Sequence, residues 1–110
     1  MFVSGKETAA AEAGAGVLRK LLGRGGGLMM TEVTFQKDAI GDIHSHPHEQ
    51  VSYIVQGSFV FHLGDETQTL KKGDSVYVAP NVPHGVRALE DESVILDVFT
   101  PQREDFLQDE

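Results

Sequence analysis

The chain of 110 residues contains no cysteine and no tryptophan. Without thiols it has no disulfide framework, no thiolate nucleophile and no cysteine-ligated zinc ribbon. No apolar run reaches the roughly 20 residues that a membrane-spanning helix requires, and the first residues lack the apolar core of a signal peptide. Since a chain without disulfides tolerates a reducing compartment, we expect a cytoplasmic protein with no membrane partner.

Basic residues are also scarce, with 9 Lys and Arg against 17 Asp and Glu, which gives a formal net charge of −8. An acidic chain repels phosphate backbones, and no basic patch with interleaved aromatic residues offsets this repulsion. We therefore expect no nucleic-acid partner. A hydrophobic fraction of 40% is too high for a disordered chain and fits one domain with a modest core.

Long helical periods are absent after residue 28. Short segments of alternating polarity take their place, each ended by Gly, Asp, Pro or Asn at a spacing of roughly 8–12 residues, which is typical of an all-β sandwich or barrel. Residues 17–22 form an earlier apolar segment that predicts a first strand. The later predicted strands are residues 28–36, 42–46, 50–56, 58–63, 67–70, 75–78, 85–88 and 93–100.

The N-terminal residues differ from the rest of the chain. Residues 1–16 are rich in Ala, Gly and Glu and predict a loosely ordered arm, with at most a turn of helix over residues 9–12. The glycine-rich residues 23–27 lack the Gly-Lys-Ser/Thr ending of a phosphate-binding loop, so we interpret them as a turn. The predicted organisation is therefore an arm over residues 1–16 and one domain over residues 17–110.

The predicted strand 50–56 has two faces of different character. Val51, Tyr53 and Val55 form a fully apolar face opposite the one that carries Gln50. If Gln50 points inward, the apolar face points outward and needs a cover, either another strand layer or a second subunit. We therefore expect a homodimer in which this face, and possibly the strand 17–22, is buried.

Four of the five histidines fall into two clusters, residues 44–48 and residues 80–84. On an extended strand His44 and His46 project from one face about 6.6 Å apart, so that both could bind one ion at about 2.0–2.1 Å. Gln50 shares their parity but would lie about 20 Å away on a straight strand, so a common site requires a turn, for which Pro47 is well placed. A lone His-x-His pair more often lies in an exposed loop than in a metal site. The second cluster, which ends at His84, favours a metal site here.

These residues resemble the two motifs of the cupins, small all-β proteins with a double-stranded β-helix or jelly-roll fold. The first motif corresponds to His44-x-His46, three residues, Gln50, six residues and Gly57. In the second motif, the distance along the chain from Gly73 to His84 matches the family spacing. It departs from the family pattern at two positions. Asn81 stands where the family has a turn glycine, and Gly41 lies two residues closer to His44 than the glycine of the family motif does. The resemblance covers about residues 28–100 and implies a single-domain cupin jelly roll.

The resemblance implies one divalent transition metal ion held by His44, His46, Gln50 and His84. The usual cupin ligand at the position of Gln50 is Glu, so the site would have a net charge near +2 instead of +1 and would attract an anion. Imidazole and amide oxygen suit Ni, Zn, Mn, Fe or Co, so the ligands leave the identity of the metal open. His48 is either a neighbour of this site or exposed, whereas Glu49 and His62 are expected outside it.

The last predicted strand places the charged Asp97 between Ile95 and Phe99 on one face. The spacing Asp97-x-Phe99-x-x-x-Arg103 is similar to that of the pectin-degradation cupins, which open the ring of 4,5-unsaturated uronates to linear 5-keto-4-deoxyuronate. This similarity implies a small anionic sugar substrate whose carboxylate pairs with Arg103, beside Phe99. It also implies that Asp97 acts as general acid and base, with a pKa raised by the hydrophobic wall of Phe99.

Three other interpretations stay open. A quercetinase-type dioxygenase would use a metal site of the same shape and would consume oxygen. A non-catalytic sugar-binding cupin would bind the ligand without turnover. Asp97 and Arg103 could also form a purely structural salt bridge. These possibilities remain because cupins with the same ligands carry out many chemistries.

Overall fold

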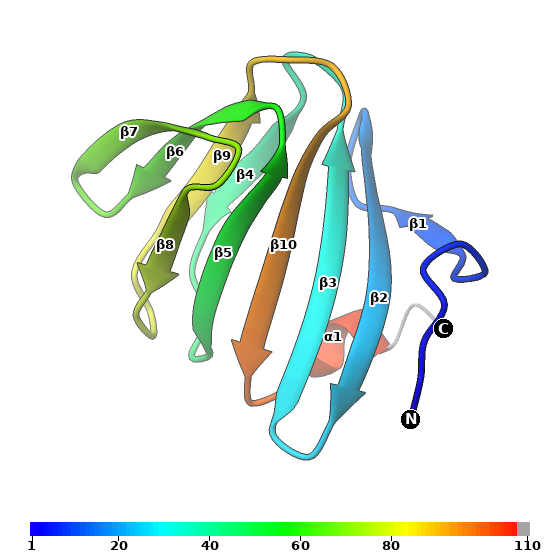
Figure 1. The fold of residues 1–110 in the computed structure, drawn as a ribbon. Helices are drawn as coiled ribbons and strands as arrows, with labels where there is room; N and C mark the ends of the chain where they lie inside the picture. Colours follow the sequence, from blue (N-terminus) through cyan, green and yellow to red (C-terminus); the bar gives the residue numbers. More distant parts are fainter. Residues whose placement is uncertain (108–110) are drawn as a thin grey trace.

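The computed structural model describes residues 1–107 and contains two antiparallel sheets that face each other (Figure 1). The larger sheet has the strand order β1-β2-β3-β10-β5-β8, and the smaller has the order β4-β9-β6-β7. This arrangement confirms the predicted all-β jelly roll. The elements are β1 (Ala10–Glu12), β2 (Val17–Gly25), β3 (Leu28–Phe35), β4 (Ile40–His44), β5 (Glu49–Gln56), β6 (Ser58–Leu63), β7 (Glu66–Lys71), β8 (Ser75–Val78), β9 (His84–Ala88), β10 (Ser93–Thr100) and α1 (Glu104–Leu107).

The strand β4 differs most from its prediction, because it begins at Ile40 and ends at His44 instead of running to His46. His46 precedes Pro47, which has no N–H to offer a sheet ladder. Its carbonyl instead accepts a hydrogen bond from the backbone N–H of Asn81 at 2.7 Å, which ties the two loops together. The expectation that His44 and His46 share one strand face was therefore wrong, whereas the expected change of direction around Pro47 is present.

The N-terminal residues contain a strand where the sequence suggested a turn of helix. Strand β1 pairs antiparallel with β2, and Ala11 lies opposite Arg19. Gly14 and Gly16, with φ of 136° and 74°, make the connection between the two strands, so the glycines favour a hairpin over a helix end. Strand β2 also runs on to Gly25, beyond its predicted end. How loosely the rest of residues 1–16 is held in solution stays a prediction.

The core lies between the two sheets. Phe35 of β3 and Phe59 of β6 meet edge to face across it, with ring centroids 5.1 Å apart. Ile54 and Ile95 of the larger sheet are buried against the same cluster, as is Val86 of the smaller one. Burial of this apolar surface is the main stabilising contribution to such a fold. Helix α1 has four residues, so no helix within residues 1–107 is long enough to cross a membrane.

The outward face of the larger sheet is apolar at its centre. Val51, Tyr53 and Val55 of β5 are 46%, 45% and 37% exposed, as their parity predicted. Val98 and Leu96 of β10 lie directly opposite Val51 and Tyr53, and side chains directly opposite in an antiparallel pair share a face. We call these five residues the outer apolar face.

Gly57 lies between β5 and β6, where the chain passes from the larger sheet to the smaller one and has no room for a side chain. Its φ is +75°, and a Cβ atom there would lie 2.9 Å from the Cα of Ser93. We expect Gly57→Ala to lower the free energy of unfolding by about 2–4 kcal/mol, from backbone strain and overpacking together. Urea unfolding of both proteins measures this loss. Gly23→Ala is the control, because a Cβ there meets nothing within 4 Å, and equal losses in the two variants would contradict the prediction.

Candidate active site

Three histidines, two from the end of β4 and the loop after it and one from β9, meet at one end of the space between the sheets. His44 ends β4 and pairs in register with His84, which begins β9. His46 comes from the loop after β4, and its ring centroid lies 4.8 Å from that of His84 and 5.5 Å from that of His44. One nitrogen from each of the three lies within 4.8 Å of the others, so they could hold a metal ion.

Backbone carbonyls orient the imidazoles of His44 and His84 in the same way. The Nδ1 atoms of His44 and His84 donate to the carbonyls of Asp42 and Val82, each at 2.9 Å. A carbonyl accepts only, so Nδ1 carries the proton and Nε2 presents a lone pair. Among the described residues, the buried Nε2 of His84 has no hydrogen-bond partner. Metal-binding histidines commonly donate their second ring nitrogen to a carbonyl, so this arrangement fits a metal ligand.

Burial favours the uncharged form of His46 and His84, which is the form that metal binding requires. Burial lowers the pKa of His84 to about 4. Burial likewise lowers the pKa of His46, although its contact with Gln50 opposes this shift. Near neutral pH both rings are therefore unprotonated at one nitrogen, which is the ligand form.

Gln50 of β5 connects the histidines to Asp97. Its Nε2 donates to the Ser52 hydroxyl at 2.9 Å and lies 3.4 Å from Oδ1 of Asp97, so its Oε1 must face the histidines. That oxygen lies 2.9 Å from Nε2 of His46, while Nδ1 of the same ring lies 3.2 Å from the carbonyl of His48. A neutral imidazole can donate to only one of these two oxygens.

A cation shared by His46 and Gln50 would satisfy both of their facing atoms. The 2.9 Å between these two atoms is short enough for both to reach one ion at about 2.1 Å. The donor set of three imidazoles and one amide oxygen therefore fits a divalent transition metal. The predicted ligands His44, His46, Gln50 and His84 are all brought together.

Asp97 of β10 lies on the inner side of the larger sheet, opposite Ser52 in register. Its Oδ1 accepts a hydrogen bond from the Ser52 hydroxyl at 2.5 Å. Burial raises the pKa of Asp97 to about 6, against the opposing effects of Ser52, Arg103 and Gln50. The sequence argument expected a raised pKa but missed Ser52, although Ser52 has the same strand parity as Gln50 and could have been found from it.

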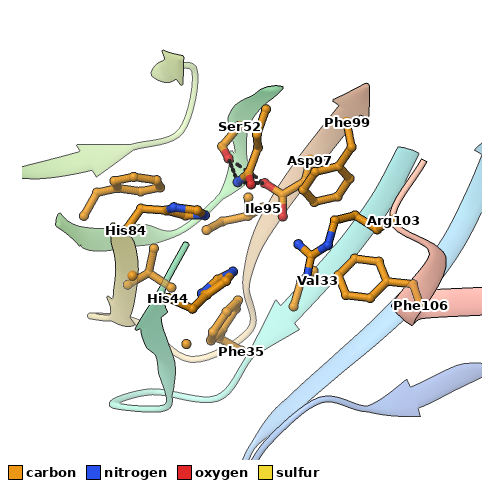
Figure 2. Close-up of a pocket in the computed structure, with 15 residues that line it drawn as sticks. Val33, Phe35, His44, Ser52, His84, Ile95, Asp97, Phe99, Arg103 and Phe106 are labelled. Atoms are coloured by element: carbon orange, nitrogen blue, oxygen red, sulfur yellow. Dashed lines mark hydrogen bonds between the residues drawn. The ribbon is translucent and has the colours of Figure 1, made fainter. Parts of the chain in front are cut away.

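A cavity of about 120 Å³ extends from the histidines to the C-terminal segment (Figure 2). Arg103 reaches it from the segment after β10, and its guanidinium is directed into the pocket beside Asp97. The guanidinium carbon lies 5.3 Å from the ring centroid of Phe99 and 4.2 Å from that of Phe106. The apolar part of the lining consists of Val33, Phe35, Phe61, Val86, Ile95, Phe99 and Phe106.

Two residues that contact Arg103 were not foreseen from the sequence. Phe106 of α1 stacks on Arg103, and Asp105 forms an ion pair with Arg103, with Nη2 and Oδ2 2.8 Å apart. Both belong to the four-residue helix α1, which is too short to leave a periodic signal in the sequence.

The remaining polar candidates are not among the three clustered histidines, but His48 is a neighbour of the site, because its ring centroid lies 5.4 Å from that of His46. The Nε2 of His48 donates to the carbonyl of Gln102 at 3.2 Å. Glu49 is exposed and accepts a hydrogen bond from the Tyr77 hydroxyl at 2.7 Å. His62 contacts the Thr67 hydroxyl at 3.1 Å on the surface of the smaller sheet.

Comparison with known proteins agrees with the fold. Residues 31–99 match the family model of the Cupin domain. The pectin degradation protein KdgF of Dickeya dadantii (strain 3937) is 43% identical over 102 residues, which cover 92% of this chain and 93% of the relative. The structure of KdgF from Halomonas sp. matches with a TM-score of 0.93 and 34% identity, covering 96% of this chain and 97% of the other.

A second solved structure, an RmlC-like cupin from Shewanella frigidimarina, matches with a TM-score of 0.90 and 38% identity. It covers 96% of this chain and 94% of the other. Both motifs, the double sheet and these similarities agree, and the chain therefore belongs to the cupin family.

Proposed function

We propose that this protein converts 4,5-unsaturated uronates to linear 5-keto-4-deoxyuronate with the help of a bound divalent metal ion. Two similar proteins bear the name KdgF, and one of them is named as a pectin degradation protein. The observation that carries the proposal is the carboxyl group of Asp97, with a pKa raised to about 6, in the same cavity as the Arg103 guanidinium and two of the clustered histidines.

The proposed reaction is an isomerisation that moves protons without any oxidant. The hydroxyl on the hemiacetal carbon loses its proton, the bond between that carbon and the ring oxygen breaks, and an aldehyde forms. The ring oxygen leaves as an enolate, which becomes a ketone when the neighbouring carbon gains a proton. Asp97 would take the first proton and deliver the second, and its pKa near 6 supports this role because both of its forms are accessible near neutral pH.

The other pocket residues bind and orient the sugar. Arg103 would hold the substrate carboxylate in a bidentate contact, and Phe99 would form the wall beside it. His44, His46, Gln50 and His84 would hold one ion per chain, of Ni, Zn, Mn, Fe or Co. When bound, such an ion supplies Lewis-acid polarisation of the substrate oxygens. Metal analysis of the purified protein identifies which of these ions it carries.

The test is to mix the metal-loaded protein with products of a pectate or alginate lyase and follow the absorbance of the unsaturated uronate. We expect the absorbance to disappear at the same rate with and without oxygen. Loss that requires oxygen would overturn the proposal in favour of the dioxygenase. Binding without any loss of absorbance would favour a sugar-binding cupin.

Arg103→Lys separates substrate binding from chemistry. An ammonium group cannot reproduce the bidentate contact, so we expect KM to rise about tenfold while kcat stays within about threefold of wild type. Steady-state kinetics measure both constants, and the melting temperature shows whether the variant is folded. If Arg103 were only structural, the variant would lose stability and keep its KM.

We propose that two chains form a homodimer through the outer apolar face. The support is its exposure, with three large apolar side chains of β5 between 37% and 46% exposed. Light scattering at micromolar concentration is expected to give the mass of a dimer. Tyr53→Glu should shift this mass to that of a monomer, because it places a charge at the centre of the face. Thr69→Glu, on the exposed strand β7, is the control, and a monomeric wild type would contradict the proposal.

A further inference from the structure

Arg103 is held by a carboxylate that follows it closely in the chain. Its Nε donates to Oδ1 of Asp105 at 3.0 Å, and its Nη2 donates to Oδ2 at 2.8 Å. The Arg103 side chain is only 10% exposed, whereas that of Asp105 is 59% exposed. The hydrogen bonds from Arg103 lower the pKa of Asp105, so this carboxylate is ionised near neutral pH.

The ion pair occupies one edge of the guanidinium and leaves another edge available. A guanidinium has five N–H donors, and Asp105 uses the Nε proton and one proton of Nη2. One proton of Nη1 and the second proton of Nη2 form an end-on fork. A second carboxylate can pair with that fork in a bidentate way while Asp105 stays in place. Asp105 is therefore compatible with a bound uronate.

The surroundings of Arg103 show why such a constraint is needed. Phe99 and Phe106 restrict the faces of the guanidinium, with ring centroids 5.3 and 4.2 Å from its central carbon. Asp97 lines the same cavity as Arg103, and Figure 2 shows the two side by side. If Asp105 did not hold the guanidinium, Arg103 could turn toward Asp97 and pair with it instead of with a substrate.

We propose that Asp105 is a positioning residue, which holds the side-on edge of Arg103 so that the end-on edge stays free for the carboxylate of a uronate. This inference rests on the proposed function, because it takes Arg103 as the residue that binds the carboxylate. Asp105 itself does not contact the reacting atoms. Its effect is therefore expected on substrate binding and not on the chemical step.

The first test compares Asp105→Asn with Glu104→Gln. Both changes remove one exposed negative charge from α1, but only Asp105 pairs with Arg103. For an unsaturated uronate we expect Asp105→Asn to raise KM roughly tenfold with kcat within about threefold of wild type, the size expected for one charge-assisted hydrogen bond. Glu104→Gln should leave both constants unchanged. An unchanged KM in Asp105→Asn would overturn the inference, and a lowered KM would show that Asp105 competes with the substrate.

The second test measures binding without turnover, with galacturonate as the charged probe and galactose as the neutral one. Calorimetric titration is expected to show galacturonate binding roughly tenfold more weakly to Asp105→Asn than to wild type, with galactose unaffected. If that result appears in a protein that does not open unsaturated uronates, the proposed function fails and the positioning role stands. A wild type that does not prefer galacturonate over galactose would overturn the positioning role.

Discussion

Asp97→Asn is expected to lower kcat by about 10²–10⁴-fold without changing the metal content, because this is the usual contribution of a positioned acid or base. The amide is the same size as the carboxylate, and its oxygen can still accept the hydrogen bond of Ser52. What it cannot do is take up and release a proton near neutral pH. Turnover of the unsaturated uronate and metal analysis of the same preparation measure the two quantities.

The stability of the same variant gives an independent check. Burial raises the pKa of Asp97 from 3.8 to about 6 in the folded protein, so folding disfavours its ionised form. This cost is absent below about pH 4, grows between pH 4 and 6, and is fully present above pH 6. Asp97→Asn should therefore be at least as stable as wild type at pH 7, with an advantage that disappears in acid.

Two results would contradict the role of Asp97. A folded Asp97→Asn protein with normal turnover would end the catalytic interpretation. Loss of stability at pH 7 with normal turnover per folded molecule would show that Asp97 is a structural partner of its neighbours. Asp65→Asn, in the exposed turn between β6 and β7, is the matched control and should leave both quantities unchanged.

His46→Ala is expected to reduce the affinity for the metal by more than about 100-fold, because even residues that only support metal ligands contribute about 10–100-fold. His46 lies in the loop between β4 and β5, so its loss removes no pair from either sheet ladder. We therefore expect a circular dichroism spectrum like that of wild type, metal content near zero after dialysis, and activity reduced to background.

A matched variant makes this result specific. His62→Ala removes a histidine from β6, outside the cluster, and should keep both metal and activity. If His46→Ala retained one metal ion per chain, His46 would not be a ligand. If it lost its β-sheet spectrum, the loop would be part of the folding framework instead.

The strands were predictable because their alternation is strong and their ends carry Gly, Pro or Asn. Residues 58–63, 75–78 and 93–100 form strands with the bounds that the pattern predicted. Alternation also placed Val51, Tyr53 and Val55 on the outer side of the sheet. In these segments local propensity and burial favour the same structure.

The parts that escaped prediction depend on contacts between distant residues or on very short elements. Strand β4 ends at His44 because the His46 carbonyl bonds Asn81, which the local pattern of residues 42–46 cannot show. Strand β1 is three residues long and is held by pairing with β2. The pairing of Arg103 with Asp105 depends on the turn into α1, so spacing alone did not separate Asp105 from the other acidic residues near the C-terminus.

The candidate ligands are divided between the two sheets. His44 and His84 belong to the smaller sheet, whereas Gln50 belongs to the larger one. An ion bound by all of them would act as a non-covalent cross-link, and its binding free energy would also favour the association of the sheets. Metal binding and sheet association would then be thermodynamically linked. A chelator that removes the ion would therefore also weaken the packing of the two sheets against each other.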